Sequence, residues 1–280
     1  MKTTKIWLLI ATCLLILGIV VFGAVMFAYQ WDFTKLGTKT YNTNTYHITE
    51  DFHNLSIHTD TADIVFAISS DDTCTVECCE EENVKHSVSV ENDTLMIQVI
   101  DERAWQDHIG INFGTSKITL YLPQREYLSL VIRNSTGHVE IPKDFQFRDV
   151  DIHVSTGNID IASSVSGDLK IHTSTGNIRA ANITAGSLEF SASTGKLLME
   201  HVVVSGPLYA KTDTGDIRLD ACDAENIQIQ TDTGDITGTL LSPKIFIAKS
   251  DTGTVHVPQS DTGGRCEVTT DTGKIELTLE

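Results

Sequence analysis

The feature that most constrains the fold is a Ser/Asp-Thr-Gly triplet that returns at a nearly constant interval. Its glycines are 19 or 20 residues apart and stand at Gly137, Gly157, Gly176, Gly195, Gly215, Gly234, Gly253 and Gly273. Repeats of this length are typical of chains in which each repeat forms one supersecondary unit that packs on its neighbours. We therefore expect eight similar coils within residues 130–280, each resting on the next.

Apolar residues keep fixed positions relative to each of these glycines. They occupy the positions two and four residues after the glycine and five and seven residues before it, and polar residues alternate with them. Alternation with period two predicts strands that bury one face. Each coil would carry two short strands, such as 227–231 and 216–219, which only stacking can supply with hydrogen-bond partners. The predicted fold is an all-β, parallel β-solenoid, or β-helix.

The triplet itself predicts a corner in each coil. Glycine permits a positive φ there, and the Ser or Asp two residues earlier should accept a hydrogen bond from the glycine N–H. The middle residue is threonine in all eight coils, and its parity matches that of the buried columns. We therefore expect these threonines to line the corner as a hydrogen-bonded ladder.

The region before the repeats begins with one more copy of the template. Residues 55–66 fit it, with Ala62 in the place of the glycine. The register then breaks, and residues 73–78, 86–91, 94–100 and 117–122 read as strands. Asn92-Asp93 is typical of a hairpin turn, and 103–114 reads as a loop. We expect an antiparallel-rich β region that caps the first coil and blocks edge pairing.

The N-terminus predicts a membrane segment. Lys2 and Lys5 precede an uncharged run over residues 6–31, and roughly 20 helical residues cross a bilayer. The run offers no A-x-A cleavage site, so an uncleaved signal anchor is favoured over a cleaved signal peptide. The lysines favour a single-pass protein of the cell membrane with its C-terminal domain extracellular. The predicted divisions are 1–31 (signal anchor with a short cytoplasmic N-terminus), 32–45 (linker), 46–129 (N-terminal β region) and 130–280 (repeats).

Charge and cysteine content restrict the partners. A net charge of -18 argues against nucleic acid, whose phosphates would be repelled. Cys74, Cys78 and Cys79 could be placed with His86 around zinc, but their spacing matches no C-x-x-C pattern, and free or opportunistically paired thiols are favoured.

The Asp-Thr-Gly copies raise two hypotheses of their own. The triplet is also the aspartic-protease signature, but its regular spacing favours structural turns. Aspartates recur at the corners, as Asp213, Asp232, Asp251 and Asp271, and just beyond two glycines, as Asp216 and Asp235. Carboxylates stacked at ~4.8 Å repel one another, so they need solvent, turn N–H groups or a bound cation such as Ca²⁺. Solvated turn caps and a cation ladder both remain open.

An outward-facing column lies four residues before each glycine. It carries a basic stripe, Arg133, His153, His172, Lys211 and Lys249, on an otherwise acidic chain. The stripe could bind an anionic envelope polymer, and an ordinary solvated face is the alternative.

These features together resemble a known family. A membrane anchor, a Leu-Tyr-Leu-Pro segment over residues 120–123 and serial Ser/Asp-Thr-Gly repeats are similar to the bacterial putative-adhesin family, which includes LiaG-like envelope proteins. The resemblance covers roughly residues 46–280 and implies an envelope location and a non-enzymatic role, without catalytic residues or cofactors.

We therefore expect a non-catalytic, membrane-anchored extracellular envelope protein that is adhesin-like or binds glycan or protein. Its partners would be the membrane, through the N-terminal helix, and an envelope polymer, glycan or membrane protein. One alternative is an accessory component of cell-envelope stress signalling. A carbohydrate-active β-helix enzyme is disfavoured, because the links between coils are short and even.

Overall fold

The computed structural model describes residues 2–32, 40–103 and 114–280. It divides into two compact units, one of Met1–Tyr41 with Arg103–Gly114 and one of Asn42–Glu102 with Thr115–Glu280. Apart from its two ends, the loop predicted at 103–114 lies outside the described residues.

The first unit contains the helix α1, Lys2–Ala28. Its segment Lys5–Ala28 has a mean hydropathy of 2.9 over its most apolar window, and that window is not buried within the protein. The helix is therefore long and apolar enough to cross a membrane, although an N-terminal signal sequence has the same length and composition.

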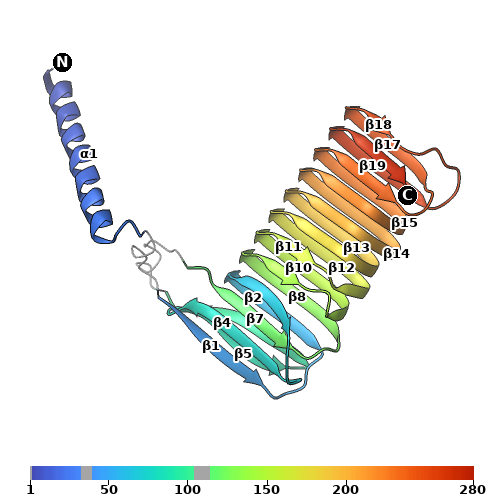
Figure 1. Ribbon diagram of the computed structural model, residues 1–280, viewed down its shortest axis with the longest axis horizontal. Coiled ribbons are helices and arrows are strands. Elements are labelled where there is room, and N and C mark those ends of the chain that lie inside the picture. Colours follow the sequence, from blue (N-terminus) through green and yellow to red (C-terminus); the bar gives the residue numbers. More distant parts are fainter. Residues whose placement is uncertain (1, 33–39, 104–113) are drawn as a thin grey trace. The chain divides into compact units, whose positions relative to one another are not determined.

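The second unit is all-β, as predicted, and its strands join one long, mostly parallel sheet (Figure 1). The N-terminal strands are β1 (Tyr41–Ile48), β2 (Asn54–Thr61), β3 (Asp63–Ile68), β4 (Cys74–Glu81), β5 (Val84–Glu91), β6 (Thr94–Asp101) and β7 (Lys117–Leu122). The strands of the repeats are β8 (Glu126–Thr136), β9 (Val139–Ile141), β10 (Gln146–Thr156), β11 (Ile159–Ile161), β12 (Ser164–Thr175), β13 (Ile178–Thr194), β14 (Leu197–Thr214), β15 (Ile217–Thr233), β16 (Ile236–Leu240), β17 (Ile245–Thr252), β18 (Val255–His256), β19 (Arg265–Thr272) and β20 (Ile275–Leu279).

Parallel pairing joins equivalent positions of successive repeats. Ile152 pairs with Ile132 on one side and with Ile171 on the other. After the corner, Ile159 pairs in the same way with Val139 and Ile178. The apolar columns are therefore continuous through the stack and form one buried core. Because equivalent positions pair in successive layers, the polar outward-facing residues of one repeat lie beside the equivalent residues of the next, as His153 lies beside Arg133 and His172.

Residues 55–66 supply a further layer below the repeats, as the template predicts. Leu55 pairs with Leu130 and Ile64 with Val139, and the Ala62 N–H donates to the carbonyl oxygen of Thr136 at 3.0 Å. Below this layer the sheet becomes mixed, as expected for the cap. β6 and β7 run parallel to β2 and β3, whereas β5 is antiparallel to β6 and β4 is antiparallel to β7. β1 begins at Tyr41, inside the stretch predicted to be linker.

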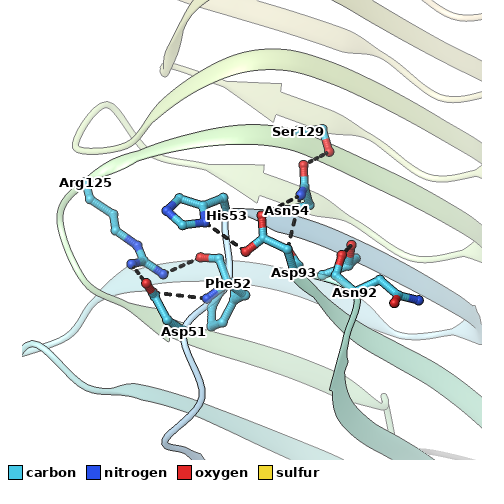
Figure 2. Close-up of polar contacts among 9 residues, drawn as sticks. Asp51, Phe52, His53, Asn54, Asn92, Asp93, Arg125 and Ser129 are labelled. Atoms are coloured by element: carbon cyan, nitrogen blue, oxygen red, sulfur yellow. Dashed lines mark hydrogen bonds and ion pairs between the residues drawn. The ribbon is translucent and has the colours of Figure 1, made fainter.

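Polar contacts attach the cap to this first layer (Figure 2). The predicted hairpin turn at Asn92-Asp93 is present, with φ of 49° and 64°. The carboxylate of Asp93 lies 2.8 Å from Nδ1 of His53. Arg125 pairs with Asp51 at 2.6 Å and lies over the ring of Phe52.

The glycine corners stand in one row, and each has a φ between 144° and 155°. Their N–H groups donate across layers to threonine carbonyl oxygens, for example Gly137 to Thr156 at 3.0 Å and Gly215 to Thr233 at 2.9 Å. The prediction that the Ser or Asp of the triplet accepts this hydrogen bond is therefore wrong. A Cβ on Gly176 would overlap the carbonyl oxygen of Gly157, so the corner excludes any side chain.

The prediction of a buried ladder of middle threonines is also wrong, because both residues before the glycine face solvent. The strand alternation ends where the chain turns, so the middle threonines are exposed: Thr136, Thr156, Thr175, Thr194, Thr214, Thr233, Thr252 and Thr272. The buried hydroxyls lie three residues before the glycine. Thr212 and Thr231 donate to the carbonyl oxygens of Gly195 and Gly215 at 3.1 and 3.0 Å. Asn134 takes the same place in the first repeat and donates to Ala62.

The last two repeats do not stack in sequence order. β19 pairs with β15 on one side and with β17 on the other, so the repeat around Gly273 lies between those around Gly234 and Gly253. Accordingly, Gly234 donates to Thr272 and Gly273 donates to Thr252. The outermost layer is β17 with β18, whose column residue Val255 is 39% exposed because no further layer covers it.

Substituting a corner glycine in the middle of the stack should separate two layers. For Gly176→Ala we expect a loss of about 2–3 kcal/mol of unfolding free energy, because the backbone is strained and a carbonyl oxygen must move. Urea denaturation measures the loss. Thr175→Ala, at an exposed position of the same corner, is the control and should change stability by less than about 0.5 kcal/mol.

A second pair of variants tests which threonine holds the corner. Thr212→Val removes a buried hydroxyl that donates to a carbonyl oxygen and should cost about 1–2 kcal/mol. Thr214→Val, two residues on, changes an exposed middle threonine and should be nearly neutral. Equal losses in thermal denaturation would contradict the observed ladder.

Candidate functional site

An open groove of about 500 Å³ lies along the first layers of the stack. One of its walls is the column four residues before each corner, which here consists of His58, Arg133, His153 and His172. The strand register places these four side by side, in that order. They project outward because the residues on either side of them belong to the buried columns.

Small hydroxyl side chains form the second edge of the groove. Ser135, Ser155 and Ser174, two residues before their glycines, follow Asp60 of the layer below. Each serine lies two residues after a wall residue on the same strand, so both belong to the same layer. The groove therefore offers donors and acceptors at regular intervals along its length.

Arg133 is fixed by two neighbouring layers. Its Nη2 lies 2.6 Å from Oδ2 of Asp151, and its Nη1 donates to the carbonyl oxygens of Ile132 and Asp151 at 3.0 Å each. Asp151 also lies 3.3 Å from Nε2 of His153. One carboxylate thus holds both a guanidinium and an imidazole, and Arg133 is not a free cation.

The imidazole rings of His153 and His172 lie near one another, with their centroids 5.3 Å apart. Partial burial lowers the pKa of His153, and the positive charge of Arg133 lowers it further, against the opposing effect of Asp151. His153 is therefore neutral at pH 7 and can both donate and accept a hydrogen bond.

The structure brings together three of the five residues predicted as a basic stripe. Arg133, His153 and His172 line the groove, whereas Lys211 and Lys249 lie further along the column and pair with Asp213 and Asp251 at 3.8 and 2.6 Å. Sequence reasoning missed His58. The signal was present, because the template fitted to residues 55–66 places His58 four residues before Ala62.

Several aspartates of the predicted cation ladder form hydrogen bonds or ion pairs with other residues of the chain. Asp213, Asp232, Asp271 and Asp251 follow one another at exposed or half-exposed corners, in that order. Asp216 pairs with Lys196 at 2.8 Å, and the backbone N–H groups of Asp235 and Lys274 donate to Asp216 and Asp235 at 3.1 and 2.9 Å. Lys196 and the Asp235 N–H lower the pKa of Asp216. These contacts relieve the repulsion at Asp216 and Asp235, and cation binding along the ladder stays a prediction.

Among the described residues, one group of metal-ligating side chains converges, and it lies elsewhere. Cys78, Glu80 and His86 place one ligand atom each within 4.8 Å of the others, and all three are buried. Burial, followed by the charge of Glu80, raises the pKa of Cys78 to about 12. Cys78 and His86 were both weighed from the sequence as zinc ligands, but Glu80 was not, and Cys74 and Cys79 stay outside the group. All six cysteines are free, as expected.

Comparison with known proteins assigns the family. The model of the family described as Toastrack DUF4097 matches residues 52–280, so this chain belongs to that family. No curated protein matches the chain. The family agrees with the resemblance to putative adhesins inferred from the repeats.

Solved structures share the fold. One described as a putative adhesin from Bacteroides fragilis is 16% identical, with a TM-score of 0.55 over 87% of this chain and 99% of its own. Another putative adhesin, from Parabacteroides distasonis, is 14% identical, with a TM-score of 0.56 over 86% of this chain and 98% of its own. A putative lipid binding protein from Parabacteroides distasonis is 17% identical, with a TM-score of 0.50 over 84% and 96%. Identities this low establish the fold alone.

The lowered pKa of His153 can be measured directly. We expect its imidazole to titrate in NMR below the reference value of about 6.5, and to titrate at a higher pH in Arg133→Gln, which removes one of the charges that lower its pKa. Because the unfolded chain binds this proton more readily, the His153 contribution to stability is lost as pH falls through about 6.5. An unchanged titration in Arg133→Gln would contradict the assigned electrostatics.

Proposed function

We propose that this chain is a non-catalytic, adhesin-like protein of the bacterial cell envelope that binds glycan in the groove lined by His58, Arg133, His153 and His172. The protein would be held at the membrane by α1, with the all-β unit outside the cell. The observation that carries the proposal is a wall of four polar side chains from four successive layers, faced by serine hydroxyls in the same register.

The architecture that presents the groove is, in this proposal, a β-solenoid. Parallel pairs at equivalent positions, a single row of eight glycine corners and one further corner at Ala62 support that description. A rigid stack of this kind fixes the spacing of outward groups at ~4.8 Å per layer. A polymer with repeating hydroxyl groups suits such a surface better than a single compact metabolite.

Local charge favours a neutral ligand over the anionic polymer considered from the sequence. The groove contains one guanidinium, which Asp151 neutralises, together with the carboxylate of Asp60. Burial and the charge of Arg133 lower the pKa of His153, so this imidazole adds no positive charge at pH 7. A chain of negative charges would therefore gain little, whereas sugar hydroxyls can use the imidazoles, the guanidinium and the serines.

The shape and the contacts fit a binding role. The groove volume lies within the range of ~300–1,000 Å³ that is usual for ligand sites.

Three residues near the groove have the connectivity of a catalytic triad. Oγ1 of Thr59 lies 2.8 Å from Nε2 of His86, and Nδ1 of His86 lies 2.7 Å from Oε2 of Glu80, as in a nucleophile, a base and an orienting acid. Thr59 lines the groove, but it is only 5% exposed and its hydroxyl contacts Nε2 of His86, which leaves little room for a substrate carbonyl beside it.

Binding of the full-length chain to an array of neutral and acidic envelope polysaccharides tests the proposal. We expect a neutral glycan to bind at pH 7, and His172→Ala to weaken the interaction about tenfold or more, equivalent to ~1.4 kcal/mol. The matched control is Lys211→Ala, which lies in the same column two layers further on, outside the groove. Absence of glycan binding, or equal losses in the two variants, would contradict the site.

A further inference from the structure

We propose that Cys78, Glu80 and His86 form a zinc site in the interior of the cap. The three side chains offer the thiolate, carboxylate and imidazole ligands that Zn²⁺ takes in proteins. Their ligand atoms lie within 4.8 Å of one another, and their exposed fractions are 0%, 1% and 4%. The site is separate from the groove and goes beyond the binding role proposed above.

The cap hairpin builds the group. Cys78 and Glu80 are two residues apart on β4, so both face the interior, and β4 turns directly into β5, where His86 also faces inward. His86 Nδ1 lies 2.7 Å from Oε2 of Glu80, and Cys78 stands beside this contact. A metal ion would take the place of this hydrogen bond between the imidazole and the carboxylate.

Outer contacts already orient two of the ligands. Oγ1 of Thr59 lies 2.8 Å from Nε2 of His86, so Nε2 can keep its hydrogen and leave Nδ1 free to bind metal. Nδ2 of Asn44 donates to Oε1 of Glu80 at 2.6 Å, which leaves Oε2 directed at His86. Such partners typically fix ligand orientation in metal sites.

A bound Zn²⁺ would explain why the Glu80 carboxylate and the Cys78 thiol are buried, because its charge would balance theirs. A glutamate that is 1% exposed stands next to a cysteine thiol that is also fully buried. One Zn²⁺ with one thiolate, one carboxylate and a neutral imidazole has no net charge, so the interior would hold no unpaired ion. The thiolate selects zinc over Ca²⁺ and Mg²⁺, which prefer oxygen ligands.

Metal titration of the full-length chain tests the site. After dialysis against chelator, we expect wild-type protein to bind one equivalent of Zn²⁺ in competition with a chromophoric chelator, and to melt at a higher temperature with Zn²⁺ than without. Cys78→Ser and Glu80→Gln should abolish both effects. Thr59→Val, which keeps all three ligands but removes the partner of Nε2, should weaken binding by about 10–100-fold.

The matched control is Cys222→Ser, because Cys222 is also 0% exposed but lies outside the group. Co²⁺ gives a spectroscopic readout in the wild-type protein itself, since a cysteine ligand produces a thiolate-to-Co²⁺ charge-transfer absorption. Its presence in wild type and in Cys222→Ser, with loss in Cys78→Ser, is the expected result. Absence of that absorption in wild type, or zinc binding that survives Cys78→Ser, would overturn the proposal and leave a hydrogen-bonded network alone.

Discussion

The structure depends on how closely one backbone approaches the next at the corners. In each layer the carbonyl oxygen of the corner residue lies against the α-carbon of the corner glycine in the next layer. The oxygen of Gly137 lies against Gly157 in this way, and the oxygen of Gly157 lies against Gly176. A Cβ at these places would overlap the oxygen, so a side chain would force two strands beyond hydrogen-bonding distance. Ala62 is tolerated because the layer beneath it consists of the separate strands β6 and β7 and has no continuous corner. The apolar columns stay in register only while this contact is kept.

Local periodicity made most of this fold predictable. The buried columns, the corner row, the extra layer at residues 55–66 and the hairpin at Asn92-Asp93 all follow from spacing within a few residues. The order of the last two layers cannot be predicted from spacing, because the repeats around Gly253 and Gly273 fit the template equally well. Only the long link after β18 lets the chain return and place β19 beneath β17.

The missed site residues have a similar explanation. His58 belongs to a layer that lacks the glycine by which the columns were aligned, so it was left out of a stripe to which it belongs. Glu80 lies beyond the predicted end of its strand, in a run of glutamates that reads as a solvated turn. The observed β4 continues to Glu81, and the alternation from Cys74 through Cys78 therefore brings Glu80 inside. Pairing between strands, which no single segment encodes, decides this position.

Two lysines of the basic stripe form ion pairs with aspartates of the acidic corners. Lys211 and Lys249 stand two residues before Asp213 and Asp251 on the same face of a strand, and each pairs with its neighbour. Exposed pairs of this kind contribute only about 0–1 kcal/mol each, so they mainly keep a chain of net charge -18 hydrated without concentrating one sign. Arg133 differs, because its carboxylate partner comes from the next layer and leaves one side of the guanidinium on the groove.

The proposed zinc site lies in the cap and the groove runs along the first layers of the stack, and β2 contributes a residue to the groove and a contact to the zinc site. His58 faces outward into the groove wall, and its neighbour Thr59 faces inward to His86. In five of the regular layers the position equivalent to Thr59 holds a hydroxyl that donates to the carbonyl oxygen of a corner glycine, as Thr212 does. Thr59 contacts the imidazole of His86 instead; the strand below β2 is β6, and His86 lies on β5, the next strand beyond it. His58 and Thr59 are thus adjacent residues of β2 that contribute to the two proposed sites from opposite faces of the strand.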